Sequence, residues 1–200
     1  MQAPVQLREL NISIGLFELP KSIGQLKYLQ KIELHDFRGT LPEEFFHLCS
    51  LMHLRIRALM ESLSDSLGNF TSLQHIDLSD CLYLQALPPS FGNLAMLQRI
   101  DLSGCRELQT LPASIGNLKQ VQYINLSWCT NLQRLPQSFG DLTNLQKVIL
   151  CSCEKLKMLP DSMNLIRLKD LDLRGCINLI VTGQTLENVS TLERLVFFLV

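Results

Sequence analysis

The chain has 200 residues, of which 46% are hydrophobic, and its 18 Lys and Arg nearly balance its 19 Asp and Glu, for a formal net charge of −1. This balance provides no strong field that would attract nucleic acid or an anionic membrane. No apolar run reaches the roughly 18 residues that cross a bilayer, and the opening "MQAPVQLREL" lacks the pattern of a secretory signal. Because the seven cysteines come without an export signal, we expect free thiols and a cytoplasmic protein whose partner is neither nucleic acid nor a membrane.

A repeat of 22 to 24 residues begins at Leu7 and runs through the chain. Its common pattern is L-x-x-L-x-L-x-x-C-x-x-L-x-x-L-P-x-S-x-G-x-L-x-x. Eight full units and a truncated ninth begin at Leu7, Leu29, Leu51, Leu73, Leu97, Val121, Leu145, Leu168 and Leu192. We number them one to nine. Repetition at this period is typical of a solenoid, in which each unit packs on its neighbours.

Each part of the pattern predicts one element of a coil. Apolar residues at the fourth and sixth positions, such as Ile100 and Leu102, alternate with polar ones and predict a short strand with one inward face. The Leu-Pro that follows ends regular pairing, because proline has no N–H and a fixed φ. The "SIGN" or "SFGN" segment then turns the chain back, with glycine supplying conformational freedom. Stacked units bury leucines that a single unit cannot bury.

The sequence therefore predicts one leucine-rich-repeat domain over residues 1–200. Its fold class is α/β, a right-handed horseshoe arc with a parallel sheet on the concave side and largely irregular or 3-10 structure on the convex side. In the unit at Leu168, Thr182 and Gly183 replace Leu-Pro, and the last unit has no capping repeat. Either the chain is part of a longer protein or another surface covers this end.

A cysteine occupies the ninth position of five consecutive units. We name as the cysteine ladder the residues Cys81, Cys105, Cys129, Cys153 and Cys176. Thiols are small and tolerate burial, so we expect them to point inward and to donate weakly to neighbouring carbonyls. Phe37 and Leu59 are expected to fill the same place in the shorter units. A metal-binding or redox ladder is the alternative, but parallel side chains in an apolar seam give poor ligand geometry.

Outward positions of the strands are expected to face a protein partner on the concave side. Tyr123, Trp128 and Ile149 fall on adjacent units, and Trp128 is the only tryptophan. Exposed aromatic residues on a rigid surface are enriched at binding hot spots. The alternative for Trp128 is packing over the edge of a coil.

Basic side chains gather on units two to five and are the second group of candidate binding residues. They are His53, Arg55, Arg57, His75 and Arg99, with His35 beside them. They predict a small basic patch for an acidic partner. The alternative is a solvated surface on which these side chains pair with acidic residues at the fifth position of the units. Exposed pairs of this kind contribute little to stability.

No pattern typical of catalysis is present: neither a nucleophile elbow, nor a phosphate-binding glycine loop, nor a metalloprotease or kinase signature. Ser90, Ser114, Ser138 and Ser162 recur at one position of the unit and are expected to serve the turn. We therefore expect a non-catalytic protein without a cofactor or a metal.

The units at 73–144, for example "LQRIDLSGCRELQTLPASIGNL", resemble the leucine-rich-repeat region of plant intracellular nucleotide-binding (TIR/NB-type) disease-resistance proteins. This resemblance implies a recognition module for a protein partner in defence. The shorter units, such as "LQKIELHDFRGTLPEEFFHL", look more like plant Ras-group-related repeats. That second resemblance implies an intracellular signalling scaffold without an immune role.

Overall fold

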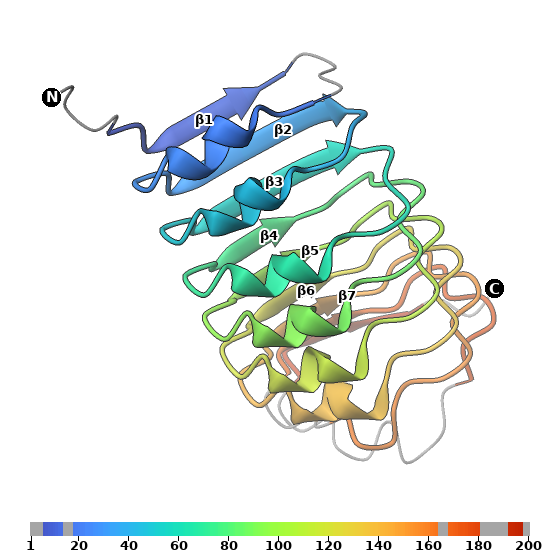
Figure 1. Cartoon of the computed structure of the whole chain (residues 1–200). Helices are drawn as coiled ribbons and strands as arrows, with labels where there is room; N and C mark the ends of the chain where they lie inside the picture. Colours follow the sequence, from blue (N-terminus) through green and yellow to red (C-terminus); the bar gives the residue numbers. More distant parts are fainter. Residues whose placement is uncertain (1–5, 14–17, 164–167, 181–191, 198–200) are drawn as a thin grey trace, which may run out of the picture.

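The computed structural model describes residues 6–13, 18–163, 168–180 and 192–197. Its strands form one parallel sheet in chain order, with each strand paired to the next, and the sheet curves without closing (Figure 1). The strands are β1 (Glu9–Ile12), β2 (Lys31–Phe37), β3 (His53–Ala58), β4 (His75–Asp77), β5 (Arg99–Asp101), β6 (Tyr123–Asn125), β7 (Lys147–Ile149), β8 (Asp170–Asp172) and β9 (Arg194–Val196). This arrangement confirms the predicted solenoid. Thr182 and Gly183 lie outside the described residues.

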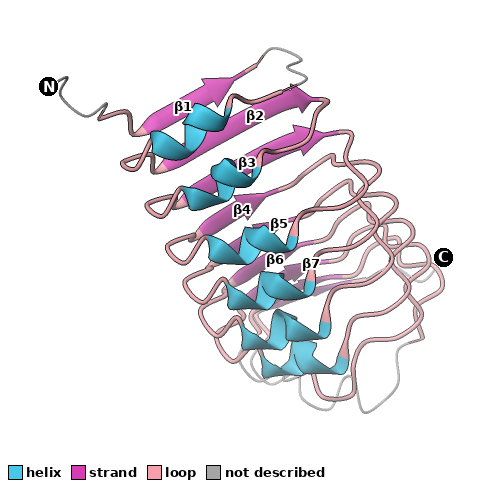
Figure 2. Ribbon diagram, viewed as in Figure 1, coloured by secondary structure: helices cyan, strands magenta, loops and turns pink. Residues whose placement is uncertain are grey.

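Short 3-10 helices stack in a second row, set apart from the strands (Figure 2). They are η1 (Lys21–Gln25), η2 (Glu43–His47), η3 (Asp65–Asn69), η4 (Pro89–Asn93), η5 (Ala113–Asn117) and η6 (Gln137–Asp141). Proline starts most of them: Pro112, for example, has φ −65° and precedes η5. The recurring serines join successive coils, since Ser114 Oγ donates to the carbonyl oxygen of Pro89 at 2.6 Å. Ser138 and Ser162 make the equivalent bonds to Ala113 and Gln137.

The glycine of the "SIGN" segment has a different role from the predicted one. Gly116 does not have a positive φ. A Cβ atom there would lie 2.5 Å from the carbonyl oxygen of Ser138 on the next coil. The repeat therefore needs glycine because the 3-10 helices approach one another closely, and conformational freedom is not the reason.

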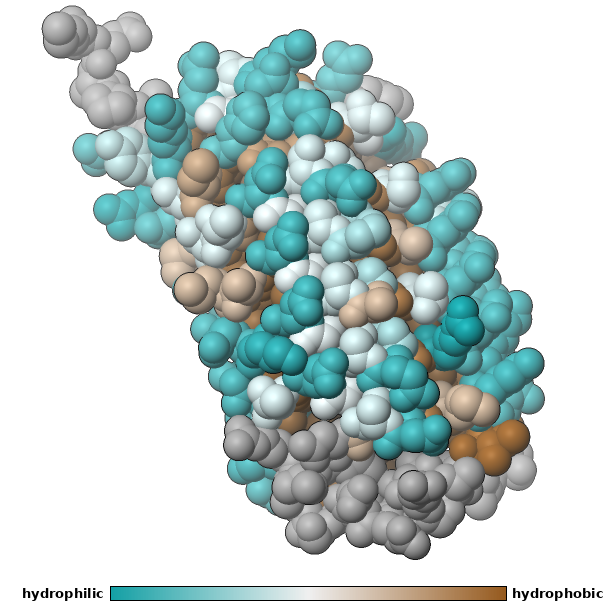
Figure 3. Space-filling model, turned by 60° about the horizontal axis from the view of Figure 1, so that its bottom comes forward, coloured by the Kyte–Doolittle hydropathy of each residue, from teal (hydrophilic) through white to brown (hydrophobic). Residues whose placement is uncertain are grey.

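The core is a continuous apolar seam between the strands and the 3-10 helices. Ile100 and Leu102 have no exposed surface, as the alternation predicted. Phenylalanines reinforce the seam in the shorter units, where the rings of Phe45 and Phe70 meet edge to face with centroids 5.7 Å apart. On the face turned forward in Figure 3, hydrophobic residues lie mostly in narrow lines between hydrophilic ones. The stacking of units therefore buries most of the apolar surface in that view.

The cysteine ladder is buried and its thiols are free, as predicted. Each sulfur donates to a carbonyl oxygen of the preceding coil; Cys105 Sγ, for example, lies 3.2 Å from the oxygen of Leu78. Burial raises the pKa of Cys81 and of Cys176 to about 11. Inside such a seam the thiols act as small apolar groups with one weak donor.

The prediction for Leu59 is wrong. Its side chain is 58% exposed, whereas Ala58 is buried and pairs with Phe37 across a register shift between β2 and β3. The backbone of Asp36 adopts φ 54°, which adds one residue to β2 before Phe37 turns inward. Unit three instead continues its strict alternation through Leu54, Ile56 and Ala58, so the ninth residue points outward.

Candidate protein-interaction site

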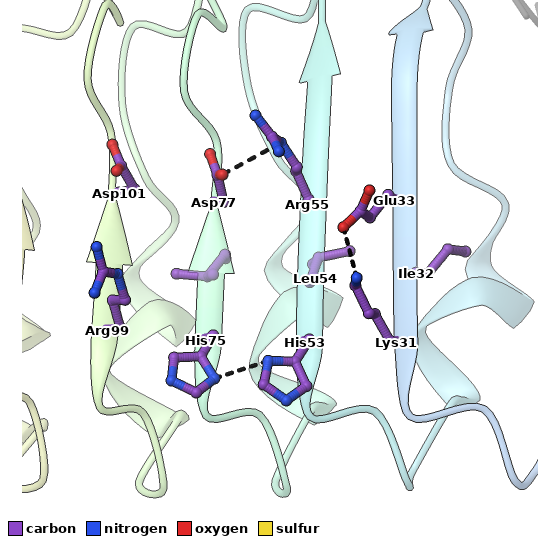
Figure 4. Close-up of a pocket in the computed structure, with 11 residues that line it drawn as sticks. Lys31, Ile32, Glu33, His53, Leu54, Arg55, His75, Asp77, Arg99 and Asp101 are labelled. Atoms are coloured by element: carbon purple, nitrogen blue, oxygen red, sulfur yellow. Dashed lines mark hydrogen bonds and ion pairs between the residues drawn. The ribbon is translucent and has the colours of Figure 1, made fainter. Parts of the chain in front are cut away.

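A hollow of about 250 Å³ opens on the sheet over β2, β3, β4 and β5. Its third-position side chains come into direct register because the strands pair without a shift at this point. We name as the basic row the residues Lys31, His53, His75 and Arg99. Figure 4 shows these four along one line, with a second line of Glu33, Arg55, Asp77 and Asp101 running parallel to it.

Two ion pairs within the hollow confirm that part of this surface pairs with itself. Lys31 Nζ lies 2.9 Å from Glu33 Oε1, and Arg55 Nε lies 3.3 Å from Asp77 Oδ2 (Figure 4). The hydrogen bond from Lys31 lowers the pKa of Glu33. These side chains are half-exposed, so each pair contributes only a small stabilisation.

His53 and His75 form the centre of the basic row. Their Nδ1 atoms are 2.8 Å apart, and their rings lie nearly parallel at 9° with centroids 4.5 Å apart. One Nδ1 must therefore carry a proton while the other accepts it. Burial lowers the pKa of His75, and the neighbouring His53 and Arg99 lower it further.

Arg99 ends the basic row with its guanidinium stacked on an aromatic ring. Its central carbon lies 3.9 Å from the ring centroid of Tyr123 on β6. Among the residues that the structure describes, the ion pairs do not include Arg99. Its charge is therefore open to a partner, although the ring fixes its position.

The predicted basic cluster thus divides in two. His53, Arg55, His75 and Arg99 all line the hollow. Arg57 does not, because it lies beyond the strand pairing of β3 with β4 and binds Asp80 at 2.8 Å. Sequence reasoning missed Lys31, Glu33, Asp77 and Asp101 as lining residues; their place at the third and fifth positions of the same units was the available signal.

The second predicted group, Tyr123, Trp128 and Ile149, is more widely spread than the residues that line the hollow. Tyr123 and Ile149 are half-buried on β6 and β7, whereas Trp128 is 55% exposed. The ring contact described for Tyr123 is with Arg99 on β5, away from β7. The backbone N–H of Trp128 donates to the carbonyl oxygen of Cys151 at 2.7 Å, which places its backbone beside unit seven.

Trp128 occupies a backbone position that does not suit it. The eighth residue has positive φ in units four to eight, with values of 59° to 73° at Asp80, Gly104, Trp128, Ser152 and Gly175. Glycine adopts this conformation without cost, and short polar residues tolerate it, but a bulky side chain is disfavoured. The scaffold therefore gains nothing from tryptophan here. The sequence indicates the same, because the equivalent positions of other units hold aspartate, glycine or serine.

Ile149 breaks a second rule of the scaffold. The fifth-position residues Asp77, Asp101 and Asn125 accept the backbone N–H two residues later, at 2.9 to 3.1 Å, and so cap the end of each strand. Ile149 stands in the same register but has no acceptor, and Cys151 replaces the usual serine. Unit seven therefore has an apolar side chain where the neighbouring units have a polar cap.

No metal site is formed within the described ranges, since they contain no group of three His, Cys, Asp or Glu side chains that could hold an ion. This finding agrees with the geometry of the histidine pair, whose nitrogens face each other. Among the same residues, no helix is long and apolar enough to cross a membrane.

Residues 2–83 match the model of the leucine-rich repeat region, and residues 96–118 match that of the leucine-rich repeat. The chain is a leucine-rich-repeat solenoid, a fold typical of protein-interaction modules. A comparison with curated proteins finds no match.

Three solved structures illustrate what the chain is similar to. A leucine-rich-repeat protein of Leptospira interrogans is 25% identical with a TM-score of 0.63, and the match covers 96% of this chain and 60% of that one. A chain of the Toll–Spätzle complex of Drosophila is 26% identical with a TM-score of 0.76, covering 94% and 26%. The ectodomain of the Arabidopsis receptor kinase GASSHO1/SCHENGEN3, in complex with CASPARIAN STRIP INTEGRITY FACTOR 2, is 24% identical with a TM-score of 0.60, covering 97% and 27%. The chain thus spans three fifths or less of these relatives.

Proposed function

We propose that this chain is a non-catalytic recognition module of a plant disease-resistance-type protein and that its concave face binds a protein partner in the cytoplasm. The repeat class supports an interaction role, and the match of units four to six to the resistance-type pattern supports a role in defence. Five buried free thiols suit a reducing compartment.

The observation that carries the proposal is the placement of Trp128. The scaffold prefers glycine at this position, yet a tryptophan that is 55% exposed stands there, three residues after the end of β6. Backbone strain that the fold does not need is often retained at functional sites. An exposed indole on a rigid support can bind with a small ordering cost, as hot-spot residues do.

A Ras-group-related signalling scaffold is the second candidate, and the N-terminal units favour it. β2 and β3 have seven and six residues, whereas each strand from β4 to β9 has three. The longer strands belong to the shorter units, whose sequence is similar to the Ras-group pattern. A single protein with both kinds of unit is compatible with either role.

The interaction role can be tested by comparing partners of three versions of the full chain expressed in plant cells. Trp128→Ala should weaken binding of the principal partner by about 2 kcal/mol or more. Met96→Ala is the matched control, because Met96 is 56% exposed in the turn that precedes β5. Equal binding by all three versions, or a loss with Met96→Ala alone, would place the interface elsewhere.

The role in defence needs a separate measurement. Removing the gene in the source organism should increase susceptibility to a pathogen, and the parent chain should restore resistance while Trp128→Ala should not. Unchanged susceptibility together with altered growth would instead support the signalling scaffold.

A further inference from the structure

The hollow over β2–β5 carries equal numbers of permanent positive and negative charges, three of each. Its cations are Lys31, Arg55 and Arg99, and its carboxylates are Glu33, Asp77 and Asp101. Each carboxylate already has a partner: Asp101 accepts from Asn125 Nδ2 at 3.2 Å, Asp77 accepts from the backbone N–H of Ser79 at 2.9 Å, and Glu33 forms the ion pair with Lys31 described above. Among the residues that line the hollow, the groups that can still change charge near neutral pH are therefore His53 and His75, while His35 lies beside it with Nε2 3.4 Å from Glu33 Oε2.

The histidine pair can take up one proton without losing its hydrogen bond. In the neutral pair, the donor ring has a free Nε2 lone pair while the acceptor ring carries its proton on Nε2. One further proton binds the free Nε2 and leaves the 2.8 Å contact between the Nδ1 atoms intact. The resulting cation presents two Nε2–H donors, whereas a second added proton would place hydrogens on both Nδ1 atoms and break the pair.

Arg99 supplies the next donor along the same row. It lies on β5, directly paired with His75 on β4, and Tyr123 holds its guanidinium in place. Neighbouring strands are about 4.8 Å apart, so the point midway between the backbones of His53 and His75 lies about 7 Å from the backbone of Arg99 across the sheet. In an extended peptide, side chains two residues apart lie on one face and are separated by about 6.7 Å. These two spacings match.

We propose that the row His53, His75 and Arg99 binds an extended acidic segment of a protein partner in which two carboxylates are two residues apart, and that binding adds one proton to the histidine pair. One carboxylate accepts from the pair and the other from Arg99. This inference deepens the proposed function, because it names the chemistry of the partner on the same concave face. Glu33, Asp77 and Asp101, already bound to donors, repel an acidic segment that has shifted along the strands.

The proposal can be tested by following the four histidines individually by NMR during a pH titration of the full chain. The probe is a synthetic peptide, Thr-Glu-Thr-Glu-Thr with blocked ends, and its matched controls are Thr-Glu-Glu-Thr-Thr and Thr-Gln-Thr-Gln-Thr. The first peptide should move the titration of the histidine pair upward by about half a pH unit or more, which corresponds to roughly threefold tighter binding by the protonated form. His47, exposed in η2 and far from the hollow, should titrate unchanged.

The controls define what would overturn the proposal. The peptide with adjacent glutamates should produce a smaller shift, and the glutamine peptide none. Equal shifts with all three peptides, no shift at all, or an equal shift at His47 would each refute it. If inorganic phosphate moves the pair as far as the first peptide does, the hollow is a general anion site, and the acidic segment is refuted.

Two variants separate the contributions of the row. Arg99→Gln should remove the preference for alternating over adjacent glutamates, because the second carboxylate loses its donor. Arg57→Gln is the matched control, since Arg57 pairs with Asp80 outside the hollow and should leave that preference unchanged. A partner whose binding depends on Trp128 but not on pH, Arg99 or either histidine would refute this inference and leave the proposed function standing.

Discussion

In units four to eight the eighth and ninth positions are neighbours in the chain, yet the fold constrains them in opposite ways. The ninth position is the buried cysteine ladder, with one residue type in five consecutive units. The eighth position holds aspartate, glycine, tryptophan, serine and glycine, which share only a positive φ. The scaffold thus specifies the side chain at the ninth position and the backbone at the eighth.

One turn explains the constraints at both the eighth and the ninth position. The N–H of Cys105 donates to the carbonyl oxygen of Leu102 at 3.2 Å, while Gly104 between them has φ 73°. A bond between the first and fourth residues with positive φ at the third is typical of a type II turn. This turn brings the cysteine beneath the sheet and leaves the eighth side chain outside. A departure from the repeat at the eighth position is therefore informative about function, whereas one at the ninth is informative about packing.

The largest effect is expected from a charge in the cysteine ladder. Cys105→Asp should lower the free energy of unfolding by about 4 kcal/mol or more, because an unpaired carboxylate would be buried in the seam. Cys105→Ser should cost about 1–3 kcal/mol, toward the lower end because a hydroxyl can still donate to the oxygen of Leu78. Urea denaturation measures both. Similar stability for the parent and the Asp variant would show that the ninth position is not buried.

Thiol labelling tests the burial of the cysteine ladder without mutation. Cys49 is exposed and Cys151 is half-buried, so both should react with a thiol reagent in the folded protein. The cysteine ladder should react more than about a hundredfold slower, because burial raises the pKa values of its thiols and labelling requires local opening. Mass spectrometry of the labelled peptides gives the rates residue by residue. Rapid labelling of all seven would contradict the buried seam.

A pair of variants at Trp128 tests the eighth position. Trp128→Gly should be more stable than Trp128→Ala by about 1 kcal/mol, because both lose the indole but only glycine relieves the positive φ. At Met96, an exposed residue without positive φ, the glycine variant should be the less stable of the two. Thermal denaturation of the four variants gives the comparison. The same order at both sites would mean that the backbone of Trp128 is not strained.

The repeat made the fold predictable in outline because strand, turn and proline recur at fixed spacing. Local corrections to that outline required coordinates. Ala58 points inward instead of Leu59 because unit three lacks the extra residue that unit two has at Asp36, a difference that the average pattern hides. The role of Gly116 depends on the distance between coils rather than on its own conformation.

The candidate site could be predicted from the sequence only where the repeat places residues at equivalent positions of adjacent strands. The spacing places His53 and His75 on adjacent strands, and the structure confirms their pairing. It does not reveal that their Nδ1 atoms meet, because that depends on the side-chain torsions. The stacking of Arg99 on Tyr123 was missed for the same reason.

The smallest expected effect concerns the pH dependence of stability at the third position. Burial lowers the pKa of His75 in the folded chain below its ordinary value of 6.5, so below that pH the unfolded chain binds more protons than the folded one. Stability should therefore be fully present above pH 6.5 and decline as the pH falls from 6.5 to the lower pKa of the folded state.

His75→Gln should reduce this decline. His47→Gln should not, because His47 is exposed in η2. Urea denaturation at closely spaced pH values measures the slope for each variant. An identical slope in the parent and His75→Gln would show that His75 is not held in its neutral form by the fold, and the third position would then be a solvated surface without a coupled histidine pair.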